Sequence, residues 1–140
     1  MANMSDYLEA KLLNHLFRGV SFNAPSSLYI ALCTDSLSDT DTGASLPEVA
    51  GAGYQRQAVP CNASQWSEPD ADGTIKNAKE IKWEKVQWED TVKAIAICDA
   101  GPNRNTGNVL FWGDLTKEKV VTADDSISFA EESLSIQIDN

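Results

Sequence analysis

Apolar residues near the start of the chain follow a helical period, whereas those beyond residue 25 follow the patterns of strands. Three leucines recur every four residues and would share one face of an α-helix: Leu8, Leu12 and Leu16. Ser5 and Asp6 offer side-chain oxygens that cap a helix start, and Gly19 is the residue type that commonly ends a helix. The pattern therefore predicts a helix over about 6–18. Its leucine face must be buried, either against the body of this chain or against a neighbouring subunit.

The rest of the chain alternates between short apolar runs and turn-rich stretches. The runs predict strands over 28–33, 54–59, 74–78, 81–83, 91–99, 109–115, 119–122, 126–129 and 134–138, with further strand-like residues at 63–66 and 86–88. Many short strands separated by turns are typical of β-sandwiches and barrels. We therefore expect a mainly β protein, a single-domain antiparallel β-sandwich over 1–140 that is jelly-roll-like and has one short N-terminal helix.

One connection is unusually long. Residues 34–53 are rich in Ser, Asp, Thr, Gly and Pro and hold few apolar positions, which predicts a long surface loop. Loops of this length in compact domains often carry function. We hypothesise that this loop meets a partner chain and becomes ordered there, with the turn-rich connection at 100–108 and the helix as the other candidates.

The charge balance narrows the choice of partners. The 140 residues include 11 Lys and Arg against 21 Asp and Glu, which gives a net charge of −10. A net anion is repelled by nucleic acid and by anionic membranes. No apolar run approaches the roughly 18–20 residues of a membrane span. The first residues also lack the basic and then apolar pattern of a signal peptide. We expect neither a nucleic-acid nor a membrane partner.

Catalytic signals are weak. Three cysteines are present, without C-x-x-C spacing, and His15 is the single histidine. Cys33 and Cys98 each end an apolar run, which predicts small buried side chains, and a catalytic thiolate would need a base beside it. No serine nucleophile motif accompanies His15. The sequence therefore indicates no catalytic residues, no cofactor and no enzyme.

Acidic loops and tryptophans leave two weaker possibilities. Asp39 and Asp41 precede Gly43 as in the opening of a calcium loop, but position twelve is Ala50 where a carboxylate is needed. We therefore expect no metal site. Four tryptophans could form a sugar-stacking surface, with Trp66 the first choice, although tryptophans within strand-like runs usually fill a core.

The order of segments resembles a family of small structural proteins of tailed bacteriophages, which are labelled tail-fibre-like or virion proteins. The resemblance covers about residues 5–138. It rests on SDYLEAKLLNHLF, on SSLYIALCT, on AIAICDAGPNRNTGNVLFWGDLTKEKVV and, most specifically, on EVAGAGYQRQAV. Two turns depart from the family pattern, because Glu89 follows Trp88 where the family has glycine, and the turn 123–125 reads ADD instead of carrying GD.

The resemblance implies a virion component without catalytic residues, assembled in the bacterial host cytoplasm. We expect a capsid decoration protein that binds the head shell, with a small tail, tail-fibre or fibre-base subunit as the alternative. A carbohydrate-binding module for host recognition is a second alternative. The expected partners are other virion proteins, either the major capsid protein or tail proteins, and further copies of the chain, possibly in a trimer. The candidate partner-contact residues are Leu8, Leu12, Leu16, Asp35, Asp39, Asp41, Tyr54 and Arg56.

Overall fold

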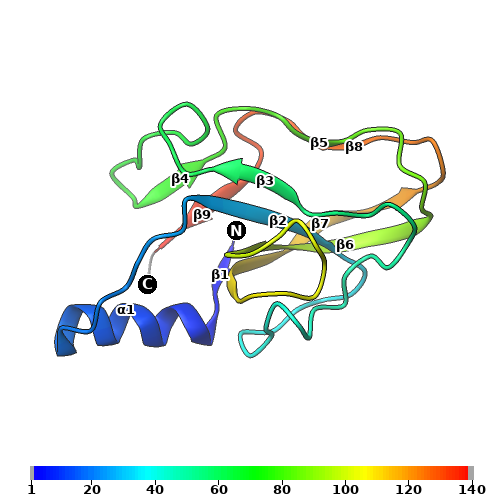
Figure 1. Ribbon diagram of the computed structural model, residues 1–140. Helices are drawn as coiled ribbons and strands as arrows, with labels where there is room; N and C mark the ends of the chain where they lie inside the picture. Colours follow the sequence, from blue (N-terminus) through cyan, green and yellow to red (C-terminus); the bar gives the residue numbers. More distant parts are fainter. Residues whose placement is uncertain (1, 139–140) are drawn as a thin grey trace.

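The computed structural model describes residues 2–138 and places its strands in stacked antiparallel sheets beside one helix (Figure 1). The helix is α1 (Asp6–Arg18). The strands are β1 (Asn3–Met4), β2 (Ser27–Cys33), β3 (Gln57–Pro60), β4 (Thr74–Lys76), β5 (Ile81–Trp83), β6 (Asp90–Cys98), β7 (Val109–Val121), β8 (Ile127–Phe129) and β9 (Ser135–Gln137). The mainly β class and the single helix agree with the prediction from the sequence.

The main layer is a five-stranded sheet in the order β1-β7-β6-β2-β3. Two ribbons, β4 with β9 and β5 with β8, form the second layer, and every pair is antiparallel. A large apolar cluster fills the space between them, with residues of β2 and β6 on one side and of β5, β8 and β9 on the other. This arrangement confirms the β-sandwich, whereas the strand pairing does not establish a jelly roll.

The outer face of the five-stranded sheet is also buried, in part by the long loop. Alternate residues of β6 point outward, and they are small: Ala94, Ala96 and Cys98. Leu37 and Leu46 of the loop pack on them. The loop also runs beside the end of β2, where the Val49 amide donates to the carbonyl of Leu32 over 3.1 Å. The prediction of a surface loop over 34–53 is therefore wrong for its apolar positions, which form a second core.

The helix begins and ends where the sequence predicts. The Ser5 hydroxyl accepts a hydrogen bond from the amide of Leu8 over 3.2 Å, and Gly19 ends the helix in the left-handed conformation with φ of 67°. The amide of Ser5 also donates to the carbonyl of Leu110 in β7 over 3.0 Å. The sheet therefore fixes the start of the helix, and Figure 1 shows the remaining turns lying beside the sandwich.

Several strand boundaries differ from the prediction. Residues 109–115 and 119–121 belong to one strand, β7, because the polar residues between them lie on an exposed length of the same strand, and residue 122 lies just beyond its end. β3 starts at Gln57 instead of residue 54, and residues 86–88 form no strand. Residues 63–66 contribute only an isolated bridge, between Trp66 and Asn77. β1 is too short to leave a periodic signal.

Candidate interaction site

A buried ion pair joins the long loop to the residues just before β3. Arg56 and Glu48 have fully buried side chains, and the Nη2 of Arg56 lies 2.7 Å from the Oε1 of Glu48. The Nε of Arg56 also donates to the Oε2 of Glu48 over 3.1 Å, which makes the contact bidentate. Burial alone would lower the pKa of Arg56, but the hydrogen bond and charge of Glu48 outweigh it, and the pKa is raised. The guanidinium of Arg56 therefore keeps its charge inside the protein.

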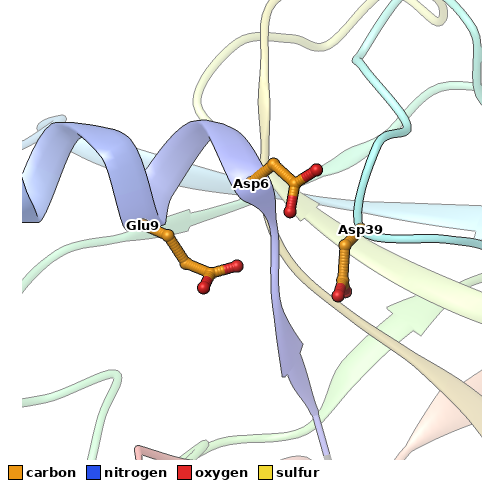
Figure 2. Close-up of side chains that lie close together, drawn as sticks. All are labelled: Asp6, Glu9 and Asp39. Atoms are coloured by element: carbon orange, nitrogen blue, oxygen red, sulfur yellow. The ribbon is translucent and has the colours of Figure 1, made fainter.

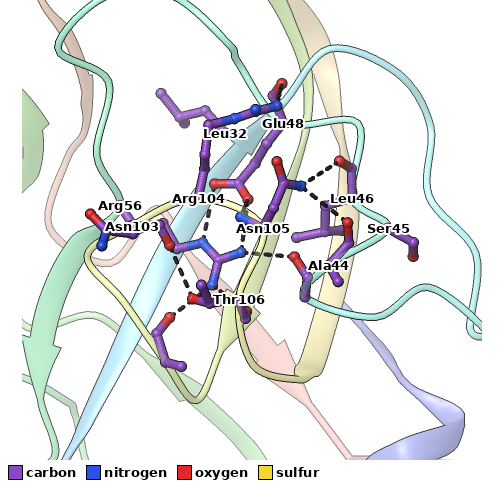
Figure 3. Close-up of polar contacts among 12 residues, drawn as sticks. Leu32, Ala44, Ser45, Leu46, Glu48, Arg56, Asn103, Arg104, Asn105 and Thr106 are labelled. Atoms are coloured by element: carbon purple, nitrogen blue, oxygen red, sulfur yellow. Dashed lines mark hydrogen bonds and ion pairs between the residues drawn. The ribbon is translucent and has the colours of Figure 1, made fainter.

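The guanidinium of Arg56 also ties two loops together (Figure 3). Its Nη1 donates to the carbonyls of Ala100 and Thr106 over 2.8 and 2.9 Å, and its Nη2 donates to the carbonyl of Gly43 over 3.2 Å. All five N–H donors of the side chain are thereby used. The side chain can therefore make no further hydrogen bond to a ligand or partner.

The carboxylate of Glu48 accepts two further hydrogen bonds from residues other than Arg56. The Tyr54 hydroxyl donates to its Oε2 over 2.7 Å, and the amide of Asn105 donates to its Oε1 over 3.0 Å. The Tyr54 oxygen in turn accepts from the amide of Leu32 over 2.9 Å. Desolvation first, and the charge of Glu48 second, raise the pKa of Tyr54 far above its ordinary value. We call Glu48, Tyr54, Arg56 and Asn105 the buried polar network.

The loops approach each other closely at Gly43. A methyl group at this position would collide with the carbonyl oxygens of Thr106 and Gly107. The amide of Gly43 instead donates to the carbonyl of Gly107 over 3.1 Å. A residue without a side chain is required here, and the loop over 34–53 is held in place by internal bonds. These contacts hold the loop over 34–53 against the connection at 100–108.

The candidate contact residues of this region fall into two groups. Tyr54 and Arg56 are buried, at 7% and 2% exposure, so they can influence a partner only through the loops that they hold. The loop carboxylates are more exposed but have local roles. Asp35 accepts from the amide of Ser36, Asp41 from the amide of Ser38, and Asp39 from the indole N–H of Trp112, each over 2.8 Å.

The helix separates the three predicted leucines. Leu8 is buried, Leu12 is half-buried and Leu16 is 72% exposed. Leu13 and Phe17 lie beside Leu16 and are 58% and 80% exposed. We call Leu13, Leu16 and Phe17 the helix patch. Only the first turns of the helix therefore pack on the sandwich, and the rest presents large apolar side chains to solvent, which is typical of an interaction surface.

Three carboxylates gather where the helix meets the long loop. Asp6 and Glu9 from the helix and Asp39 from the loop place carboxylate oxygens within 4.8 Å of one another (Figure 2). All three residues are exposed, and exposed acidic groups often cluster without an ion. Calcium takes six to eight oxygen ligands, so these side chains would supply only part of a coordination shell. The arrangement makes this corner of the protein strongly negative.

The cysteines, His15 and the tryptophans are the remaining candidates for chemistry, and their positions do not support a role in catalysis or sugar binding. Cys33 and Cys98 are fully buried, as predicted, and burial raises the pKa of Cys98 to about 12. His15 is exposed, and its Nδ1 lies 2.9 Å from the carbonyl oxygen of Val20. Trp66 is only 9% exposed and lines an apolar pocket, so little of its ring is available for stacking on a sugar. The other three indoles are buried or half-buried in the clusters beside the sheet: Trp83, Trp88 and Trp112.

The comparisons bear on these surfaces. Within the described residues, the one helix falls short of the length and apolarity that crossing a membrane requires. No curated protein matches the chain. A family model described as podophage GP4 fiber I protein gp80 matches residues 3–137, and this confirms the resemblance to virion proteins of tailed phages. Because the match extends over nearly the whole chain, the protein belongs to the family of the podophage GP4 fiber I protein gp80.

Proposed function

We propose that the protein is a subunit of a podophage fibre that joins neighbouring virion proteins through the helix patch. The helix patch carries this proposal, because three large apolar side chains at 58–80% exposure lie on a helix that the sheet anchors only at its start. Burying such side chains against a partner would contribute roughly 1.5–3 kcal/mol for each. The rigid sandwich behind it, fixed by the buried polar network, would give the patch a defined direction.

The family match favours a fibre over the capsid decoration protein that the sequence first suggested. Its printed description names a fibre protein, which corresponds to the tail or fibre-base alternative. A carbohydrate-binding role has less support, since Trp66 is buried. We also propose a binding role instead of catalysis, because the buried network is saturated by its own partners. The protein would act in the virion after assembly in the bacterial cytoplasm.

Incorporation into virions tests the proposal. Phages that carry Phe17→Ser should assemble with fewer copies of the protein than wild type, because a polar residue removes the apolar anchor from the helix patch. Quantitative mass spectrometry of purified virions gives the number of copies in each particle. The same count separates the two virion roles, since a fibre subunit is present in few copies and a decoration protein in hundreds.

A matched control is available on β7. Val120 is also 72% exposed but lies on β7 and not on the helix, so Val120→Ser removes apolar surface of a similar exposure. We expect this variant to enter virions like wild type. Normal incorporation of Phe17→Ser, with its melting temperature unchanged, would contradict the assignment of the helix patch. Hundreds of copies in each particle would contradict the fibre role.

A further inference from the structure

The face of the helix that carries the patch is also acidic at its start. Residues three or four apart lie on the same side of a helix, so Asp6 and Glu9 precede Leu13, Leu16 and Phe17 along one stripe. Asp39 adds a third carboxylate beside the first two. The stripe therefore runs from a negative end to an apolar end, with about 12 Å between Glu9 and Phe17 at the helical rise.

A pocket elsewhere in the same chain has the complementary character. It has a volume of about 490 Å³ and opens between β7 and the segment that runs from β8 to β9. Its apolar lining includes Leu115, Phe129 and Leu134. Pockets of 300–1,000 Å³ accept drug-sized groups, so this one has room for a phenylalanine side chain and a neighbouring leucine.

The charges at this pocket have the sign opposite to those of the helix stripe. Lys117 and Lys119 line it, and Lys117 forms no ion pair with any residue in the described range. Lys119 lies 5.0 Å from the ring centroid of Phe129 and donates to the carbonyl of Ser128 over 3.2 Å. Asp114 also lines the pocket, but both its oxygens already accept from the Ser36 hydroxyl at 3.0 Å. The lining is therefore net positive in a protein of charge −10.

We infer that the acidic and apolar stripe of one copy docks into the β7 pocket of a second copy. Phe17 and Leu16 would enter the apolar lining, while Glu9 and its neighbouring carboxylates would face Lys117 and Lys119. The inference rests on the proposed function, since it gives the helix patch a specific occupant. In a fibre, this contact would join successive copies of the subunit, and complementary charge would select the partner and its orientation.

Two other docking sites for the acidic and apolar helix stripe fit less well. A second pocket of about 650 Å³ is also largely apolar, but its charged lining residue is Glu68, which would repel Asp6 and Glu9. Two helix patches could instead pair with each other in antiparallel orientation. That pairing, centred on Leu16 and Phe17, would bury apolar area but leave all the carboxylates of both copies without a cation. The β7 pocket satisfies both the apolar and the charged part of the stripe.

Charge exchange in the purified full-length protein tests this contact. Sedimentation velocity would be measured for wild type, for Glu9→Lys, for Lys117→Glu and for the two substitutions together. We expect wild type to self-associate, with a sedimentation coefficient that rises with protein concentration and falls as salt rises, because salt screens exposed charge pairs. Each single exchange should weaken association by about tenfold or more, and the double exchange should restore most of it, since the charges again attract.

Two controls keep the result specific. Glu118→Lys changes the charge at the neighbouring position of β7, a residue that does not line the pocket, and should leave association unchanged. Phe17→Ser should abolish association while the helix signal in circular dichroism persists, because Phe17 is 80% exposed. A chain that stays monomeric to about 1 mM would overturn the inference. So would single exchanges without effect, or a double exchange that stays weak.

Failure of this inference can be told apart from failure of the proposed function. A monomeric protein whose Phe17→Ser variant is still lost from virions would overturn the contact between copies and leave the helix patch as a seat for a different virion protein. The opposite combination of results is also informative. If the purified protein forms an oligomer that responds to charge exchange as expected, but virions still incorporate Phe17→Ser normally, the contact between copies is supported and the role of the patch in incorporation is contradicted.

Discussion

The buried polar network and the helix patch both hold side chains in environments that are costly for them, but in opposite ways. In the network, charged and hydroxyl groups are buried, and all five donors of Arg56 have acceptors within the chain. In the patch, three large apolar groups face solvent, and no residue in the described range 2–138 covers them. A saturated polar centre can only be structural, whereas an uncovered apolar surface remains free for a partner. The comparison therefore separates what holds this protein together from what it uses to assemble.

The largest effect should follow from breaking the network. Arg56→Met leaves the Glu48 carboxylate buried without a cation, and the carbonyls of Gly43, Ala100 and Thr106 lose a donor. Removing one partner of a buried pair typically costs about 3–5 kcal/mol of the free energy of unfolding. Urea denaturation followed by tryptophan fluorescence measures this loss.

An exposed pair gives the matched comparison. The Nζ of Lys82 lies 3.3 Å from the Oε1 of Glu84, and their side chains are 39% and 70% exposed. Lys82→Met makes the corresponding change there, and surface pairs of this kind contribute at most about 1 kcal/mol. Equal losses for Arg56→Met and Lys82→Met would show that the network is not the structural centre that we describe.

The next largest effect should come from within the helix. Leu8 is buried at 6% exposure, so Leu8→Ala should lower the free energy of unfolding by about 2–3 kcal/mol. Leu16→Ala, at the other end of the leucine face formed by Leu8, Leu12 and Leu16, should change it by less than about 0.5 kcal/mol. Thermal melts of the isolated protein compare the two variants. A loss of similar size for Leu16→Ala would mean that the helix patch is covered within the chain.

The helix could be predicted to the residue because its signals are local. Ser5 and Gly19 mark its ends through their own side-chain and backbone chemistry, and a leucine period requires burial somewhere. The same period could not say which leucines the sandwich covers. That depends on the hydrogen bond from Ser5 to β7, which fixes only the first turn.

The buried polar network could not be predicted, because the sequence around each of its residues does not indicate that the residue is buried. Tyr54 and Arg56 alternate with glutamines as in an ordinary half-exposed strand, so the sequence placed both of them at a partner contact. Glu48 lies within a loop whose composition indicates solvent exposure. The available signal was an arginine between buried positions, since a guanidinium there requires a carboxylate partner.

The two buried cysteines of the sheet, Cys33 and Cys98, should affect the free energy of unfolding only at alkaline pH. Burial raises the pKa of Cys98 from its ordinary 9.0 to about 12 and raises that of Cys33 as well. Above pH 9 the unfolded chain releases these protons and the folded protein does not. The stability that each thiol gives is therefore complete below pH 9 and is lost as the pH rises towards 12.

Urea midpoints across this range test the cysteine effect. Wild type should lose stability with rising pH, and Cys98→Ala should flatten that decline by about 1.4 kcal/mol per pH unit, the slope of one proton. The exposed Cys61 supplies the control, since Cys61→Ala should flatten the decline less. Identical slopes for all three proteins would show that Cys98 ionises as readily when folded.

The smallest effect should come from the three carboxylates beside the helix patch. If they hold no cation, their mutual repulsion opposes folding, and Asp39→Asn should raise the free energy of unfolding by up to about 0.5 kcal/mol in low salt. The amide oxygen of asparagine can still accept the hydrogen bond from the indole N–H of Trp112, so the packing of the loop is kept. High salt should remove the gain, because it screens exposed charges.

Calcium or EDTA should leave the melting temperature of wild type unchanged, since three exposed ligands give a site too weak to be filled at millimolar calcium. A rise of several degrees with calcium, lost in Asp39→Asn, would instead identify a metal site at this corner. The carboxylates would then already be paired with a cation before any second copy arrived.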